Sequence, residues 1–391
     1  MIVLIRGPLL SVTGYGCHTR QIWKWARSKP EWQVHASIVP WGMCTYYTDP
    51  DAEGGVIGDI MANSGQPSVK PDLTIQVQLP DEWDPDLGKV NIGVTAGIEA
   101  DKCSMKWVTA CEKMDRVIVP SEYSKLAILN GGFPKDKIVS VPEAITCGFE
   151  ETPAANEVTS RLDNISTDFN FLVFGQITSS NVDTDRKNTF NCLKWLCEEF
   201  QGREDVGIVI KTNLGRMTVQ DRHYSMSTIN QALSMVRKGE YPKVYVVHGL
   251  MDPNELGAIY RHDKVKALVA PTRGEGWGLP ILDAAANGLP VIATGHSGHL
   301  DFLKHTKFLD IKFSLKEIPE SMQDGRIWVK GARWAEPSEK HFKSRVRKFK
   351  DSSRPPTQWA AEGASKIREL FSIDAVFSKY DEAIGDLVDL P

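Results

Sequence analysis

Two acidic residues stand eight positions apart around a glycine loop and the start of a predicted helix. Glu275 lies between Gly274 and Gly276, and Asp283 follows Pro280 by less than one helical turn. Proline suits the first turn of a helix because its missing N–H would be unpaired there anyway. The free amide groups and the positive dipole end of such a helix attract a phosphate. The pattern therefore predicts an anion over the loop, with a carboxylate on either side of the helix start.

The flanking residues place this loop at the edge of a parallel sheet. Residues 266–270 form a predicted strand before the loop, residues 290–294 form another after the helix, and Gly288 closes the helix. Ligands of open α/β sheets bind at the carboxyl ends of the strands. In that position Asp283 can accept hydrogen bonds from ribose hydroxyls, and Glu275 can reach a sugar. The alternative is an ordinary strand-to-helix turn with both acids in solvent.

The stretch Arg273-Gly274-Glu275-Gly276-Trp277-Gly278-Leu279-Pro280-Ile281-Leu282-Asp283-Ala284-Ala285, extended to Asp301, resembles the Glu-x7-Glu region of family-4-like retaining glycosyltransferases of GT-B fold. The resemblance implies that Glu275 contacts the transferred sugar and Asp283 the ribose. It also implies that the nucleotide-sugar donor lies against Gly274, Gly276, Trp277, Gly278 and Leu279. One position departs from the family pattern, because Asp283 is one methylene shorter than the usual second glutamate.

Strand-like apolar runs alternate with helix-length polar segments along the whole chain. The runs comprise residues 2–5, 32–39, 73–77, 116–119, 171–174, 206–210, 244–247, 267–270 and 291–293. This alternation predicts the α/β class with parallel sheets, and it restarts after a polar stretch, which places a domain boundary near residue 155. With the resemblance, it predicts a GT-B fold of two Rossmann-like, doubly wound domains facing across a cleft. The expected parts are an acceptor domain (1–155), a donor domain (156–370) and a terminal helix (371–391) that crosses back to the first domain.

Basic residues follow the first strand of the second half. Arg186 and Lys187 open a predicted helix, and fixed cations there would stabilise the negative charge of a departing diphosphate. Lys187 matches the lysine that the resembling family keeps at this point. Gln176 stands where the family has an arginine, and Arg186 is expected to replace that arginine. Lys211, at the end of the next strand, is a further candidate. The alternative is an exposed basic pair at a helix start.

Four further positions are candidates on the strength of the resemblance. Gly14 and Gly16 lie in a loop after the first strand, which in the family lies beneath the donor phosphate. His248 and Leu250 follow the strand 244–247, where the family holds the nucleobase. Each pair could equally form a structural turn.

Glu99 follows the strand 90–95, where the family has a histidine that touches the sugar. No histidine occurs between His35 and His223, so Glu99 or the backbone of Gly97 is expected to take that place. Glu99 could orient the acceptor hydroxyl, or it could be a surface acid.

Composition limits the other classes of function. The formal net charge of −4 argues against a protein coated in positive charge for nucleic acid. Seven cysteines without a Cys-x-x-Cys pair favour a reducing, cytoplasmic compartment rather than a zinc site or disulfides. The Asp-x-Asp motifs at 49–51, 84–86 and 183–185 are attributed to chance, so no metal site is predicted. No cofactor is predicted either. The co-substrate is expected to be a UDP-sugar. No run reaches the ~18 apolar residues of a membrane span.

The acceptor is the least defined partner. Segments 11–20, 78–83 and 93–101 resemble glycosyltransferases encoded by tailed phages, some of which modify 5-hydroxymethylated pyrimidines in DNA. The resemblance implies that the protein is located in the cytoplasm of the host cell. Between residues 326 and 354 stand ten basic and three acidic residues, as contact with DNA phosphates would require. The alternatives are a solvated basic helix and a glycan, lipid-linked or protein acceptor.

A two-domain oxidoreductase is disfavoured by the missing Gly-x-Gly-x-x-Gly, and a non-catalytic nucleotide-sugar or DNA-binding module stays open. Oligomeric state is not indicated.

Overall fold

The computed structural model describes residues 1–175, 181–213, 215 and 217–388. The chain forms two compact units. Unit 1 comprises Met1–Ala144, Met322–Arg333 and Leu370–Pro391, and unit 2 comprises Ile145–Ser321 and Trp334–Glu369. The first division thus falls after Ala144, whereas the sequence pattern placed it near residue 155. No helix among the described residues combines the length and apolarity needed to cross a membrane.

Unit 1 is built on a six-stranded parallel sheet in the order β2-β1-β3-β4-β5-β6. The strands are β1 (Ile2–Gly7), β2 (Gln33–Ile38), β3 (Leu73–Val77), β4 (Val90–Val94), β5 (Arg116–Val119) and β6 (Ile138–Ser140). Because β2 and β3 lie on opposite sides of β1, the winding direction reverses between β1 and β3. That reversal is the point at which open α/β sheets bind ligands.

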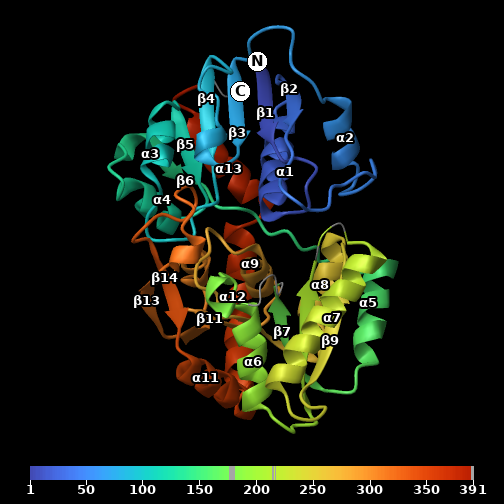
Figure 1. The fold of residues 1–391 in the computed structure, drawn as a ribbon. Coiled ribbons are helices and arrows are strands. Elements are labelled where there is room, and N and C mark those ends of the chain that lie inside the picture. Colours follow the sequence, from blue (N-terminus) through green and yellow to red (C-terminus); the bar gives the residue numbers. More distant parts are fainter. Residues whose placement is uncertain (176–180, 214, 216, 389–391) are drawn as a thin grey trace. The chain divides into compact units, whose positions relative to one another are not determined.

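Helices cover this sheet: α1 (Gly14–Arg27), α2 (Val56–Ala62), α3 (Met105–Glu112), α4 (Glu122–Leu129), α13 (Ile373–Ile384) and the 3-10 turns η1 (Pro80–Glu82) and η2 (Lys135–Lys137). The C-terminal helix α13 lies beside α1 (Figure 1). Trp25 donates from Nε1 to Asp381 at 2.8 Å, and His18 Nε2 lies 2.8 Å from the Tyr380 hydroxyl. These buried contacts make α13 part of the unit 1 core.

Helix α1 begins at Gly14, so it includes the two glycines that the sequence pattern placed in a loop. The Thr13 side chain caps it by accepting a hydrogen bond from the Gly16 amide. Gly16 must lack a side chain, because an added Cβ would lie 1.9 Å from the Ser11 carbonyl oxygen. The two glycines of the expected loop therefore stand in the first turn of a capped helix.

Unit 2 has a second six-stranded parallel sheet, ordered β12-β11-β10-β7-β8-β9. Its strands are β7 (Phe169–Phe174), β8 (Val206–Thr212), β9 (Lys243–His248), β10 (Val265–Ala270), β11 (Val291–Thr294) and β12 (Leu309–Ile311). Here the winding reverses between β7 and β10. The predicted α/β class with parallel sheets is confirmed in both units.

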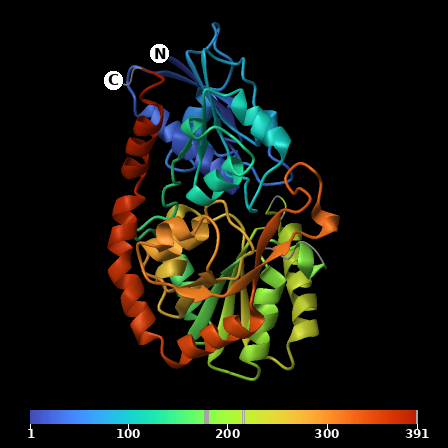
Figure 2. The same cartoon turned by 90° about the vertical axis from the view of Figure 1, so that its left-hand side faces the viewer.

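The remaining helices, turns and strands lie mostly in unit 2. Its helices are α5 (Pro153–Asp163), α6 (Thr189–Glu199), α7 (Val219–Val236), α8 (Pro253–Arg261), α9 (Leu279–Ala286), α10 (Leu300–Leu303), α11 (Glu339–Asp351) and α12 (Arg354–Leu370), with η3 (Val182–Thr184), η4 (Glu320–Met322) and the pair β13 (Phe313–Glu317) and β14 (Arg333–Pro337). Helix α12 runs along one side of unit 2 (Figure 2). Arg368 on α12 donates to the carbonyl of Ala286 at the end of α9, at 2.7 Å.

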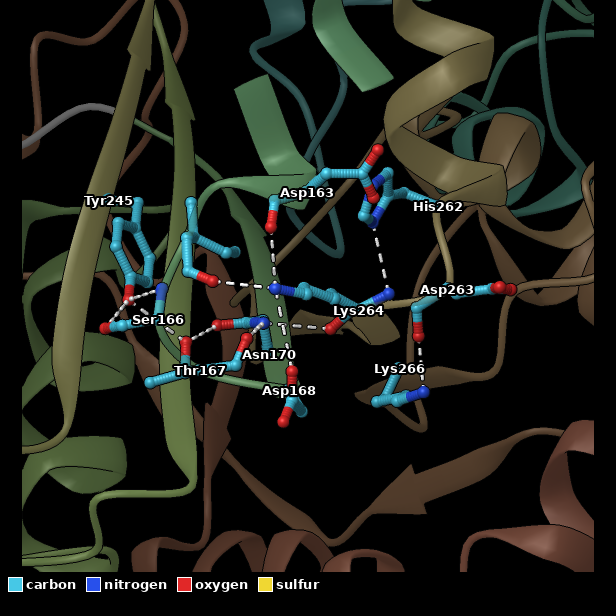
Figure 3. A network of polar contacts seen from close by, with 11 residues as sticks. Asp163, Ser166, Thr167, Asp168, Asn170, Tyr245, His262, Asp263, Lys264 and Lys266 are labelled. Carbon is cyan, nitrogen blue, oxygen red and sulfur yellow. Dashed lines mark hydrogen bonds and ion pairs between the residues drawn. The ribbon is translucent and has the colours of Figure 1, made fainter. Parts of the chain in front are cut away.

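A buried polar network fixes the amino ends of the unit 2 strands (Figure 3). The Asn170 amide donates to the carbonyls of Thr167 and Lys264 at 2.9 and 3.0 Å, which joins β7 to β10. Lys264 Nζ donates to the carbonyls of Asp163 and Ile165 at the end of α5. These bonds hold β7 and β10 in register at one end and so align their carboxyl ends at the other.

Replacing Asn170 by Leu should lower the free energy of unfolding by about 2 kcal/mol, because buried backbone carbonyls lose their donor. Urea unfolding followed by circular dichroism measures the change. Asp168→Asn is the matched control, since Asp168 is exposed and its ion pair with Lys264 is long, at 3.6 Å. Equal unfolding midpoints for Asn170→Leu and wild type would contradict the role of the network.

Candidate active site

The candidate site lies where the winding of the unit 2 sheet reverses. The loops that leave β7 and β10 meet there, at the carboxyl ends of the two strands. A cavity at this point is lined by Val173, Phe174, Lys187, Cys192, Leu268, Val269, Ala270, Pro271, Thr272, Glu275, Gly278, Pro280 and Ile281. Its lining combines the apolar strand ends with the charged side chains of Lys187 and Glu275.

Glu275 is buried and paired with both predicted cations. Its carboxylate accepts hydrogen bonds from Lys187 Nζ at 2.7 and 2.8 Å, and Arg186 Nη1 lies 3.2 Å from Oε2. Burial alone would raise the pKa of Glu275, but the charges of Lys187 and Arg186 outweigh it and lower the pKa to about 2. The carboxylate is therefore ionised at every physiological pH.

The backbone around Glu275 is fixed by the loop that follows β11. The Glu275 amide donates to Ser297 Oγ at 3.0 Å, and its carbonyl accepts from the Gly298 amide at 2.9 Å. Ser297 adopts a positive φ of 81°, an uncommon conformation for a residue with a side chain. Nearby, His299 Nε2 lies 2.7 Å from the Thr294 carbonyl oxygen, and burial lowers the pKa of His299. This second loop therefore fixes the backbone that carries the acid.

Arg273 organises the site, although sequence reasoning assigned it no role. Its side chain is 1% exposed and donates to the carbonyls of Val182 and Asp185, both at 2.7 Å. It also forms a two-point ion pair with Glu336, at 2.8 and 3.1 Å. The signal in the sequence was an arginine three positions after a buried strand, where an exposed side chain is the usual expectation.

Further hydrogen bonds connect the segment that carries Arg186 and Lys187 to the glycine loop. The Arg273 amide donates to the Arg186 carbonyl at 2.8 Å, and Arg186 Nη1 donates to the Gly274 carbonyl. Thus the segment that carries Arg186 and Lys187 is tied to the glycine loop from both directions. The two cations owe their placement beside Glu275 to these bonds.

Lys211, His248 and Leu250 lie at the carboxyl ends of β8 and β9, on the β8–β9 side of β7. Lys211 is buried, and its Nζ donates to Asn213 Oδ1 at 2.6 Å and to the Gly249 carbonyl at 2.7 Å. Burial lowers the pKa of Lys211 to about 8. His248 is half-buried with a lowered pKa, and Leu250 is exposed. The buried cation thus fixes the turn that bears His248 and Leu250.

Asp283 is engaged by protein groups. Its side chain is 2% exposed and accepts hydrogen bonds from the Thr146 amide at 2.8 Å, the Thr146 hydroxyl at 2.5 Å and the Cys147 amide at 3.3 Å. Burial raises the pKa of Asp283, and these donors oppose that rise. Ribose hydroxyls would have to replace these donors, so contact with a ribose stays a prediction.

The remaining loop residues differ in their surroundings. Gly278 caps α9 with a φ of 103°, which favours glycine, while Gly274 and Gly276 are buried on either side of Glu275. Leu279 is half-buried. Trp277 is 3% exposed and packs edge-on against Phe302, with ring centroids 5.1 Å apart. Trp277 is therefore a core residue in this structure, and its contact with a donor stays a prediction.

Three predicted residues belong to unit 1. Gly14 and Gly16 start α1, and Glu99 is half-buried after β4. Burial raises the pKa of Tyr15, and the charge of Glu99 adds to that rise. Gln176 lies outside the described residues. Among the residues that the structure describes, no group of three or more His, Cys, Asp or Glu side chains is placed to hold a metal ion.

Comparison with known proteins agrees with this geometry. Residues 232–324 match the family model described as glycosyl transferases group 1. No curated protein matches the chain. Among solved structures, Anabaena HepE in complex with UDP and glucose superposes with a TM-score of 0.64 at 11% identity, covering 99% of this chain and 100% of the other.

Two further structures show the same fold. A glycosyltransferase from Rickettsia africae gives a TM-score of 0.68 at 11% identity, covering 100% of this chain and 99% of the other. Sucrose-phosphate synthase from Thermosynechococcus elongatus gives 0.64 at 13% identity, with 99% of each chain covered. The chain therefore has the predicted GT-B fold, and the family match supports a glycosyltransferase.

Replacing Arg273 by Lys should cost about 3 kcal/mol of unfolding free energy, because an ammonium cannot span the two carbonyls and the Glu336 carboxylate together. Arg347→Lys is the matched control, since the Arg347 side chain is 61% exposed and the variant should lose less than about 1 kcal/mol. Thermal unfolding compares the two variants. Equal losses would contradict the central place of Arg273.

Proposed function

We propose that this protein transfers a sugar from a UDP-sugar to an acceptor hydroxyl with retention of the anomeric configuration. The observation that carries the proposal is the buried, ionised Glu275 beside Arg186 and Lys187, at the reversal of the unit 2 sheet. A diphosphate fits a site with two cations and a helix start, and a carboxylate fits sugar hydroxyls. The UDP and glucose bound by Anabaena HepE support a UDP-sugar as the donor.

The donor takes a defined orientation in this proposal. Its diphosphate lies against Arg186, Lys187 and the start of α9, and its sugar lies against Glu275. The base lies toward His248 and Leu250, in the turn that Lys211 fixes. Ser297 and Gly298 keep Glu275 from following the cations when they turn to the phosphate.

The proposed transfer step depends on the negative charge that develops on the leaving phosphate. The bond between the anomeric carbon and the phosphate oxygen breaks, and the acceptor oxygen bonds to the same face of that carbon. The acceptor proton passes to the leaving phosphate oxygen, where negative charge accumulates. Arg186 and Lys187 stabilise that charge without a metal ion. Their fixed positions, set by Arg273, mean that little reorganisation is needed during the reaction.

Two classes of acceptor were expected, 5-hydroxymethylated pyrimidines in phage DNA and a glycan, lipid-linked or protein hydroxyl. The basic residues between 326 and 354 are divided between the two units. Ion pairs engage Arg326 with Asp81 and Glu82, Arg333 with Asp101, Lys343 with Glu198, Arg345 with Asp310, Arg347 with Glu199, and Lys350 with Asp205. Cations with carboxylate partners attract DNA phosphates weakly, so this observation favours the second class.

Replacing Glu275 by Gln should lower the rate of sugar transfer at least a hundredfold, because a neutral amide cannot balance the cations or hold the sugar as a carboxylate does. UDP should still bind, since Arg186 and Lys187 remain. UDP release from UDP-glucose measures turnover, and calorimetry measures UDP affinity. Wild-type turnover by a folded Glu275→Gln protein would refute the assignment.

UDP affinity should fall as the pH rises through about 8, because Lys211 loses its positive charge there. The group is protonated below that pH, so the favourable interaction is present at pH 7 and is lost above pH 9. Lys211→Met should bind UDP more weakly at pH 7 and show no step near pH 8. Lys187→Met is the control, which should bind weakly but keep the step. A step that persists in Lys211→Met would contradict the prediction.

A further inference from the structure

Residues 322–333 belong to unit 1, although the chain on both sides of them belongs to unit 2. The chain returns to unit 2 within strand β14, because Arg333 is the last residue of the unit 1 segment and Trp334 the first of the following unit 2 segment. A single short strand therefore has its start in one unit and its remainder in the other. The contacts at its two ends indicate what this connection does.

The start of β14 is tied to unit 1 by three hydrogen bonds between Arg333 and Asp101. The Asp101 carboxylate accepts from the Arg333 amide and from Arg333 Nε, both at 2.7 Å, and the Asp101 amide donates to the Arg333 carbonyl at 3.1 Å. Asp101 follows Glu99, the candidate for orienting the acceptor hydroxyl, by two positions. Ile98 and Ala100, on either side of Glu99, are each 2% exposed. The start of β14 is thus fixed to the short, well-packed segment that bears Glu99.

The residues that precede β14 are attached to unit 1 as well. Arg326 donates to Asp81 from Nε at 2.7 Å and from Nη2 at 3.1 Å, and Nη2 also donates to Glu82 at 2.6 Å. Ile327 packs against the apolar cluster that includes Ile98. These contacts join the approach to β14 to the same part of unit 1 as the Glu99 segment.

The remainder of β14 is tied to Arg273 in unit 2. The Ala335 amide donates to the Arg273 carbonyl at 2.8 Å, and the Glu336 carboxylate accepts from the Arg273 side chain at 2.8 and 3.1 Å. The guanidinium carbon of Arg273 lies 5.2 Å from the centre of the Trp334 ring. Trp334 and Ala335 are 1% and 0% exposed. Because a close-packed interior transmits displacement, a shift of Arg273 requires a shift of β14.

Arg273 also holds the segment that carries the two cations of the candidate site. Its side chain donates to the carbonyls of Val182 and Asp185, and its amide donates to the carbonyl of Arg186. In the proposed donor complex, the cations of this segment turn from Glu275 to the diphosphate. The buried Arg273 side chain passes the accompanying movement of the backbone to β14.

We propose that β14 couples the donor site of unit 2 to the Glu99 segment of unit 1, with Glu336 and Asp101 as positioning residues at its two ends. Occupation of the cation cluster shifts Arg273 and β14, and Arg333 passes that shift to Asp101. The donor thereby completes the arrangement of the acceptor side, which disfavours loss of the sugar to water before an acceptor is present. The proposal rests on the proposed function, because it assigns the diphosphate to the cation cluster.

Hydrogen exchange followed by mass spectrometry tests the coupling. In the wild-type protein, UDP should slow the amide exchange of residues 98–104 by about threefold or more. Asp101→Ala should abolish this response, while its UDP affinity by calorimetry stays within about threefold of wild type. Asp101→Asn keeps one acceptor oxygen for Arg333 and should restore part of the response. A merely structural role of Asp101 would change the basal exchange of this segment and leave its response to UDP in place.

Lys89→Met is the matched control in unit 1, since Lys89 forms an ion pair with Asp72 and its side chain is 66% exposed. It should respond to UDP as wild type does. Slower exchange of residues 182–187 with UDP, without any change in residues 98–104 of the wild-type protein, would overturn the coupling. An equal response of residues 98–104 in wild type and in folded Asp101→Ala would overturn it as well.

A second comparison needs no donor and so separates the coupling from the proposed function. Without UDP, Glu336→Gln should raise the exchange of residues 98–104 by about threefold or more, because Arg273 loses the ion pair that fixes it to β14. Glu198→Gln is the matched control, since Glu198 also forms an ion pair within unit 2, with Lys343. If UDP does not bind while Glu336→Gln still raises this exchange, the proposed function fails and the connection through β14 stands. Equal exchange in Glu336→Gln and Glu198→Gln would sink the coupling alone.

Discussion

The structure depends most on the ion cluster formed by Glu275, Arg186 and Lys187. A carboxylate out of water is costly unless it is paired, and two adjacent cations repel each other unless an anion lies between them. Each therefore requires the others, and the charges of Lys187 and Arg186 lower the pKa of Glu275 to about 2 although the group is buried. A diphosphate can take over the role of the carboxylate toward the cations, and this exchange is the physical basis of donor binding in the proposal.

The rest of unit 2 serves to hold this cluster together. The parallel pairing of β7 with β10 brings two loops that are distant in sequence to the same edge. Arg273 then fixes the cation segment to the glycine loop, and Ser297 accepts a hydrogen bond from the Glu275 amide. Without these bonds, the three charged side chains would still be present but would no longer be held beside one another.

Much of the fold and of the candidate site could be predicted from the sequence. Apolar runs of strand length, separated by helix-length segments, gave the α/β class, and the spacing of Glu275 and Pro280 gave the loop and the helix start. Arg186 and Lys187 were expected on the grounds of charge. The pairing of both with Glu275 required knowledge of which strands are neighbours, which local patterns do not contain.

Other features were beyond local patterns. The burial of Arg273 follows from carbonyl groups that lie about 90 positions away in the chain. The donors to Asp283 come from Thr146 and Cys147, which no spacing rule connects to it. The early start of α1 depends on the Thr13 cap and on the lack of space at Gly16. In each case a tertiary contact decided the outcome.

The most direct measurement is a crystal structure of the protein with UDP-glucose bound. The account predicts that the diphosphate contacts Arg186 and Lys187 at the start of α9, with the glucose against Glu275. A diphosphate bound elsewhere, with the ion cluster left intact, would contradict it.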